Sequence, residues 1–194
     1  SVVRRAEDAF TLITAAVAQS HDADWLRRDM PAGLIFRDRT EDFSCLIVTG
    51  PKSRDLLAGL TDADLTAPWL SVQGAVVAGK DCALFRVSFA GELGWEVHAT
   101  PARMPAIYDA ILAAGAKPFG MFALNSLRIE KGYRAWKGDL STDYTLLEGG
   151  LERFVKFDKP QDFPGKAALL AQKQRGVGKR FCTLLIEAGD QDPP

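Results

Sequence analysis

The chain has 194 residues, of which 47% are hydrophobic and 25% charged, and its formal net charge is −1. This length supports one substantial core or two small ones, and the composition is that of an ordinary globular domain. Its mixed, nearly balanced charges argue against a nucleic-acid partner. A membrane partner is not expected either, because no apolar run approaches the ~20 residues of a bilayer span.

Cysteines and histidines are few and widely separated. The odd number of cysteines, Cys45, Cys82 and Cys182, each in an apolar run, predicts buried free thiols in a reducing compartment. We therefore expect a cytoplasmic protein, or one from a similarly reducing lumen. Since no cysteine or histidine has metal-ligand spacing, and the histidines are His21 and His98 alone, we expect no metal site.

The first third of the chain predicts several strands around one short helix. β-branched and apolar runs indicate strands at 10–17, 34–37 and 45–49. Asp22 is a candidate N-cap for a helix that carries Trp25. After the third run, the turn at 50–53 predicts the end of a strand and the start of a helix at 54–60. Residues 61–71 are typical of a loop.

The segment 83–98 predicts a β-hairpin with a short glycine-containing loop. Because side chains alternate along a strand, Trp95 and Val97 share one face of the second arm. Glu96 and His98 then lie on the other face. If the aromatic faces of both arms are core, Glu96 faces either water or a cleft. The aromatic face of the first arm carries Phe85, Val87 and Phe89.

The second half of the chain mixes helices and strands. Apolar residues at helical spacing from Met104 to Leu112 predict a helix that Gly115 ends. Because hairpins and helices alternate irregularly, the expected class is α+β, with mostly antiparallel sheets and packed helices. The remaining predicted elements are a helix at 120–131, a strand at 151–157, a helix at 166–174 and a strand at 181–186.

Three motifs follow one another in a fixed order. They read SFAGELGWE at 88–96, LRIEKGYRAW at 127–136 and TLLEGGL at 145–151. In order and spacing they resemble the folate-binding aminomethyltransferase family, which includes the glycine-cleavage T-protein. Within it, the chain looks most like the tetrahydrofolate domain of dimethylglycine and sarcosine dehydrogenases. We expect residues 1–178 to form this domain without its opening segment, and 179–194 to begin a truncated C-terminal barrel.

The resemblance implies roles for three residues. Glu96 matches the carboxylate that binds the pteridine ring of tetrahydrofolate, and a carboxylate can accept two N–H bonds from such a ring edge. Tyr133 matches an aromatic position near the folate. Phe89 matches a position that often carries tyrosine, so the ring remains and the hydroxyl is lost. The family's catalytic aspartate belongs to the opening segment, so we assign no catalytic residue and expect this chain alone to be inactive.

The implied cofactor is tetrahydrofolate, with FAD confined to a flavin domain absent from this chain. Such an oxidoreductase oxidises an N-methyl amine to an iminium, and its folate domain captures the one-carbon unit as methylenetetrahydrofolate. Two alternatives stay open. One is a glycine-cleavage T-protein, which the pair Leu124-Asn125 disfavours because T-proteins often carry Arg-Asp there. The other is a non-catalytic folate-sensing or interaction module. For Glu96 itself, the alternative to folate binding is a solvated carboxylate on a strand.

Overall fold

The fold is α+β with antiparallel sheets, as expected. The computed structural model describes residues 1–187 and 189. Ser1–Lys131 forms one compact unit, and a second begins at Gly132. The helices and strands of the first unit are β1 (Val2–Arg4), β2 (Phe10–Leu12), α1 (Gln19–Arg28), β3 (Ser44–Thr49), α2 (Ser53–Ala58), β4 (Val72–Val77), β5 (Lys80–Phe85), β6 (Gly94–Ala99), α3 (Met104–Ala113) and α4 (Met121–Glu130).

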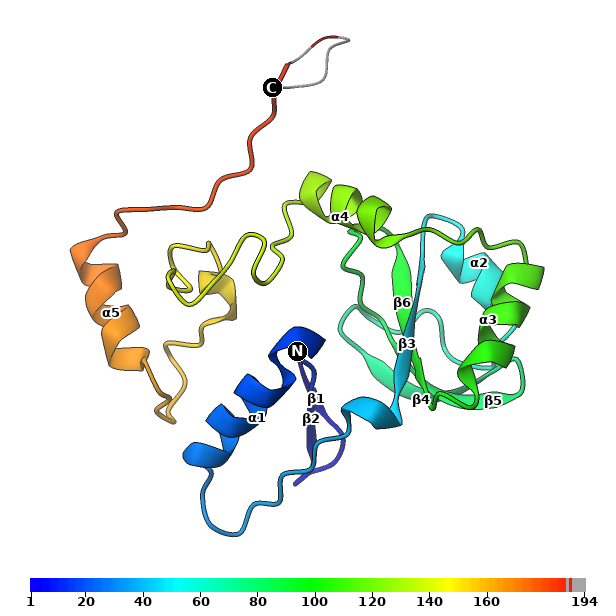
Figure 1. Ribbon diagram of the computed structural model, residues 1–194, viewed down its shortest axis with the longest axis horizontal. Coiled ribbons are helices and arrows are strands. Elements are labelled where there is room, and N and C mark those ends of the chain that lie inside the picture. The colour runs from blue at the N-terminus through cyan, green and yellow to red at the C-terminus, as the bar shows by residue number, and fades with distance from the viewer. Residues whose placement is uncertain (188, 190–194) are drawn as a thin grey trace. The chain divides into compact units, whose positions relative to one another are not determined.

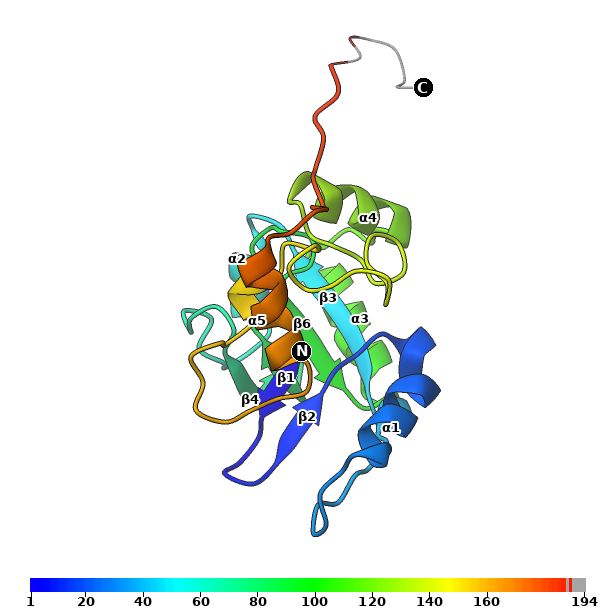
Figure 2. The same ribbon diagram turned by 90° about the vertical axis from the view of Figure 1, so that its left-hand side faces the viewer.

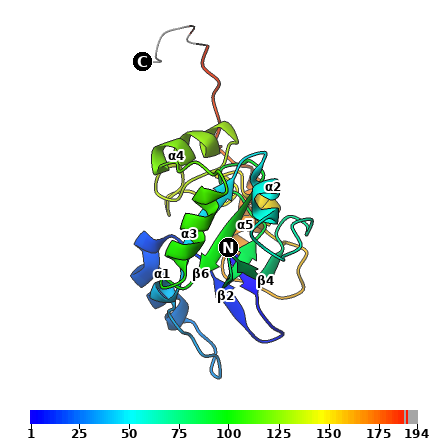
Figure 3. The same ribbon diagram turned by 90° about the vertical axis from the view of Figure 1, so that its right-hand side faces the viewer.

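A four-stranded sheet is the centre of the first unit. Its strands run in the order β3-β6-β5-β4, and each neighbouring pair is antiparallel. Helices α2 and α3 lie against one face of this sheet (Figures 1 and 3). Burial of apolar side chains between these layers supplies the driving force for folding. The core consists of Val48, Leu57, Leu65, Val77, Leu84, Trp95, Val97, Ala99, Met104, Ile107 and Ile111.

Helix α3 confirms the prediction from apolar spacing. Met104, Ile107 and Ile111 are buried against the sheet. Gly115 follows the helix with a φ of +99°, a left-handed conformation that glycine adopts without steric cost. The predicted helices at 54–60 and 120–131 also form, as α2 and α4.

The N-terminal segment differs from its prediction. Strand β2 ends at Leu12 and pairs with β1, a ribbon drawn in dark blue beside α1 in Figure 2. Helix α1 begins at Gln19, so Asp22 lies within its first turn and does not cap it. Residues 34–37, all of them described, form no strand. Ile35 is 80% exposed. An apolar run that has no partner strand forms no backbone ladder, so nothing stabilises it as a strand.

The predicted hairpin forms, but its connection is longer than expected. Strand β5 ends at Phe85 because the backbone of the next residue, Arg86, pairs elsewhere: its N–H donates to Ser71 and its carbonyl accepts from Leu70. Residues 86–93 therefore form a loop. Phe85 is buried, at 5% exposed, but it does not share a face with Trp95 and Val97. It stands opposite Glu96 in the register, and directly opposed residues share a face, so Phe85 lies on the Glu96 side of the sheet.

The second unit contains η3 (Glu152–Phe154) and α5 (Lys166–Arg175). Helix α5 confirms the prediction at 166–174. The strands predicted at 151–157 and 181–186 do not form in the described residues, where the first gives a 3-10 turn and the second an irregular extended segment. The domain boundary expected at 178–179 stays a prediction. Among the described residues, none of the helices is long and apolar enough to cross a membrane.

Candidate functional site

The face of the sheet opposite α2 and α3 carries polar side chains from two adjacent strands. In the register, Glu96 of β6 pairs with Ile47 and Phe85 on its two sides, and His98 pairs with Cys45 of β3. Because directly opposed residues share a face, these five side chains lie together. We call Cys45, Ile47, Phe85, Glu96 and His98 the Glu96 face.

Glu96 is held in place by its neighbours on this face. Its Oε2 lies 2.9 Å from Nε2 of His98, and the side chains of Glu96 and His98 are 23% and 16% exposed. The ring of Phe85 stacks on the imidazole, with centroids 4.2 Å apart and planes at 26°. A carboxylate with a hydrogen-bonded imidazole and limited access to water has a preferred orientation. The predicted site residue is therefore oriented and partly sheltered.

Cys45 completes a cluster with Glu96 and His98. The thiol sulfur, a carboxylate oxygen and an imidazole nitrogen all lie within 4.8 Å of one another. Although Cys45 as a residue is exposed, burial of its sulfur raises the thiol pKa to about 12, and the negative charge of Glu96 adds to the shift. The sulfur is therefore a protonated thiol near neutral pH.

The cysteine prediction is confirmed in part. Cys45, Cys82 and Cys182 are free thiols. Their expected burial is wrong, since Cys45 and Cys182 are exposed and Cys82 is half-buried. The cluster around Cys45 escaped the sequence analysis because its members are far apart in the chain and meet only through strand pairing. From the sequence, only the placement of Glu96 and His98 on the same face of one strand could be predicted.

Phe89 lies in the loop that joins β5 to β6, and it is 37% exposed. The end of this loop is fixed to the turn between β3 and α2. The carbonyl of Leu93 accepts hydrogen bonds from the Gly50 N–H (2.8 Å) and the Thr49 hydroxyl (3.2 Å). The Ser53 hydroxyl lies 2.6 Å from the Gly50 carbonyl and 3.0 Å from that of Leu93. The ring of Phe89 is therefore carried by a loop with an anchored end.

Tyr133 belongs to the second unit, where it is half-buried immediately after α4. Its neighbours are held by local contacts. The Arg134 guanidinium donates to the Gly132 carbonyl at 2.9 Å and lies 4.9 Å from the centre of the Phe181 ring. Gly132 has a φ of +71°, so the chain turns sharply there. The roles predicted for Glu96, Phe89 and Tyr133 remain predictions.

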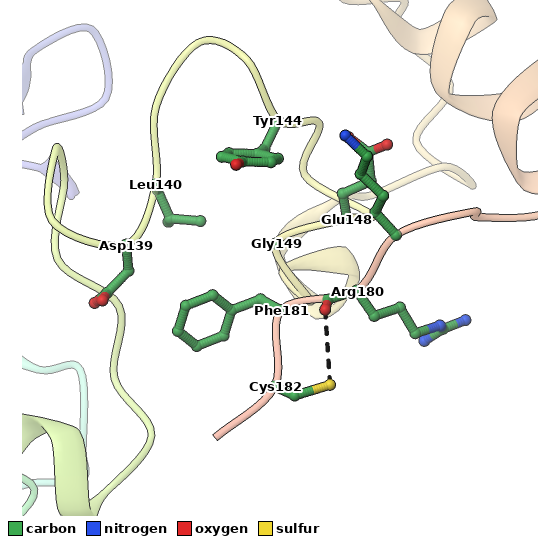
Figure 4. Close-up of a pocket in the computed structure, with 9 residues that line it drawn as sticks. Asp139, Leu140, Tyr144, Glu148, Gly149, Arg180, Phe181 and Cys182 are labelled. Carbon is green, nitrogen blue, oxygen red and sulfur yellow. Dashed lines mark hydrogen bonds between the residues drawn. The ribbon is translucent and has the colours of Figure 1, made fainter. Parts of the chain in front are cut away.

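The second unit also contains a cavity of about 330 Å³. It forms where the extended segment after α5 passes the 139–149 loop, and the Phe181 N–H donates to the Glu148 carbonyl at 2.8 Å. In Figure 4 the side chains of Leu140 and Phe181 point into the space between these segments, whereas Arg180 points away. The lining combines apolar rings with scattered charges, and it presents no cluster typical of one reaction.

The first unit is therefore an α+β domain. Helices cover one face of its sheet, and the other face carries an oriented carboxylate. Residues 1–159 match the GCVT N-terminal domain, and the chain belongs to that family. This confirms the predicted resemblance.

Curated relatives fall into two groups. Human dimethylglycine dehydrogenase is 36% identical over the whole chain, which covers 23% of that protein. Mouse sarcosine dehydrogenase is 40% identical over 77% of the chain and 17% of its own length. An aminomethyltransferase of Listeria innocua is 32% identical over 97% of the chain and 53% of its own length. The chain thus spans about a quarter of the dimethylglycine dehydrogenase and about half of the aminomethyltransferase.

Proposed function

We propose that this chain is the tetrahydrofolate-binding domain of a flavin-dependent N-methyl amine dehydrogenase, acting on dimethylglycine or sarcosine. The observation that carries the proposal is the placement of Glu96. Its carboxylate lies on the sheet face opposite the packed helices, 2.9 Å from the His98 imidazole and 23% exposed. Membership of the GCVT N-terminal domain family and the dehydrogenases among the relatives support the same function.

The chemistry of a pteridine fits an oriented carboxylate. The amino-pyrimidinone edge of the ring presents two parallel N–H donors, and two charge-assisted hydrogen bonds to one carboxylate are strong and directional. The flat faces of the pteridine suit aromatic side chains. Phe89 and Tyr133 are the aromatic residues that we assign to the folate in this proposal. The hydrogen bond from His98 to Oε2 restricts rotation of the carboxylate before the ligand arrives.

Within such an enzyme the role of this chain is to bind and orient the folate. The bound folate supplies a nucleophilic nitrogen that captures the one-carbon unit of an iminium delivered from a flavin domain, giving methylenetetrahydrofolate. Holding that nitrogen close to the arriving iminium converts a bimolecular encounter into a local one. We place this activity in the cytoplasm or another reducing compartment, which the three free cysteines support.

Calorimetric titration with tetrahydrofolate, in the presence of EDTA, tests the assignment of Glu96. We expect Glu96→Ala to weaken binding by about 2 kcal/mol or more, which is roughly thirtyfold, because buried N–H donors of the ligand lose their acceptor. The matched control is Glu92→Ala, which removes an exposed carboxylate of the adjoining loop and should leave the affinity unchanged. An unaltered affinity in Glu96→Ala contradicts the role of this side chain.

The second candidate function is aminomethyl transfer, which the similarity to the Listeria innocua protein favours. Both functions use the same folate, so the affinity measurement does not separate them. The sequence of the gene around the region that encodes this chain does. A dinucleotide-binding flavin domain upstream supports the dehydrogenase, whereas its absence supports a transferase or a non-catalytic folate-binding module.

A further inference from the structure

Three different metal-ligating side chains meet on the Glu96 face. Cys45 and His98 are direct partners across β3 and β6, and Glu96 lies two residues from His98 along the same strand, so all three project to one side. Their sulfur, nitrogen and oxygen atoms lie within 4.8 Å of one another. Each residue contributes a different donor, and the three converge from adjacent, hydrogen-bonded strands.

This spacing is close to that of a coordinated metal ion. In tetrahedral zinc sites the bonds are about 2.3 Å to sulfur and about 2.0–2.2 Å to nitrogen or oxygen, so neighbouring ligand atoms lie about 3.3–3.8 Å apart. Nε2 of His98 and Oε2 of Glu96 are 2.9 Å apart, a hydrogen-bond distance, and the three donor atoms lie within 4.8 Å of one another. Changes of about 1 Å in these separations bring the donors to the spacing required around one ion.

We infer that Cys45, Glu96 and His98 form a three-ligand binding site for a thiophilic divalent cation, with Zn²⁺ the best fit. On binding, the Cys45 thiol releases its proton to solvent and its sulfur bonds to the ion as a thiolate, while bonds to the ion replace the His98–Glu96 hydrogen bond. A thiolate and an imidazole favour zinc over magnesium or calcium, which prefer oxygen ligands. Three protein ligands leave the fourth position of a tetrahedral ion open to water or another ligand. The exposed position of Cys45 on the outer strand of the sheet gives the ion access.

The surroundings of the three ligands support this inference. Phe85 is 5% exposed and stacks on the His98 ring, so the imidazole is fixed in orientation by packing. Groups that orient a ligand raise metal affinity, because less freedom is lost on binding. Ile47, opposite Glu96 in the register, adds an apolar neighbour. The site is thus built on a sheet, which holds ligands more firmly than a loop does.

Under the proposed function, the metal and the folate share one protein ligand. The metal and the pteridine both require the Glu96 carboxylate, so they compete for it. Bound zinc should therefore lower the affinity for tetrahydrofolate, and EDTA should restore it.

Cobalt titration of the chelator-treated 194-residue chain tests the site directly. Co²⁺ occupies zinc sites, and a cysteine ligand gives a sulfur-to-cobalt charge-transfer band. We expect one equivalent of Co²⁺ to produce this band and Zn²⁺ to displace it. Cys45→Ser should abolish the band, and His98→Gln should weaken cobalt binding at least about tenfold. The chain provides matched controls: Cys182→Ser and His21→Gln should behave as the unaltered protein.

A second measurement keeps the test decisive if a variant does not fold. Zn²⁺ added to the unaltered protein should protect Cys45, and not Cys182, from alkylation, as read by peptide mass spectrometry. Absence of the charge-transfer band, or its persistence in folded Cys45→Ser, overturns the inference. So does equal alkylation of Cys45 with and without zinc. These readouts involve no folate, and the folate titration is done in EDTA, so failure of one proposal is distinguishable from failure of the other.

Discussion

The two faces of the four-stranded sheet are made by the same strands, but their side chains differ in polarity and in exposure to solvent. On the helix-covered face, Leu84, Trp95 and Val97 are no more than 1% exposed. On the other face, at alternate positions of β6, the Glu96 and His98 side chains are 23% and 16% exposed. Strand β6 thus alternates a core residue with a site residue at each step. A two-residue period lets one strand serve stability on one side and chemistry on the other.

The largest effect should come from the core face. Trp95→Ala removes a side chain that is 1% exposed and whose ring lies 4.6 Å from the Arg86 guanidinium. We expect a loss of about 3–5 kcal/mol in the free energy of unfolding, because a cavity forms and packing is lost. Urea denaturation followed by far-ultraviolet circular dichroism measures it. A loss below about 1 kcal/mol would show that this face is not the core that supports the sheet.

The Cys45 thiol should react with alkylating reagents more slowly in the folded protein than in the unfolded chain. Its pKa is raised from 9.0 to about 12, first by burial and then by Glu96. A raised pKa means less thiolate at a given pH, so at pH 8 alkylation of the native thiol should be at least about tenfold slower than in the urea-unfolded chain.

That rate is measured for Cys45 alone when Cys82→Ser and Cys182→Ser remove the other thiols. The native thiol keeps its proton up to a higher pH. Its alkylation rate should therefore still rise with pH above 9, where the rate for the unfolded chain levels off. Equal rates at pH 8 in the native and unfolded chain would contradict the raised pKa of this thiol.

The smallest effect on stability should come from the site face. We expect His98→Gln to lower the free energy of unfolding by no more than about 1.5 kcal/mol, since it loses one hydrogen bond and a ring contact without opening a cavity in the core. Urea denaturation alongside Trp95→Ala gives the direct comparison. A cost equal to that of Trp95→Ala would mean that the two faces are both structural, and the contrast between them would fail.

Elements whose apolar residues follow a regular period were predictable from the sequence. The burial of Met104, Ile107 and Ile111 in α3 follows from their helical spacing, and β6 follows from alternation. The failures were apolar runs at 34–37, 151–157 and 181–186. Such a run becomes a strand only beside a partner with unpaired backbone groups, and its own residues do not reveal whether one is present.

Glu96 could be assigned from the sequence because a local pattern and a family motif coincide on it. Its partners could not be assigned. A short hairpin loop, with both aromatic faces taken as core, would put Phe85 on the side of Trp95. Pairing of Arg86 with the 70–71 segment instead ends β5 early and leaves Phe85 opposite Glu96. That change of pairing decides which residue stands opposite Glu96.

The sequence by itself determined the α+β class, the family and the alternation that separates Trp95 from Glu96, because each depends on residues close together in the chain. Only the tertiary structure brought Cys45 to His98. Their meeting depends on the register between β3 and β6, and a register is set by long-range hydrogen bonding and packing that no local pattern contains.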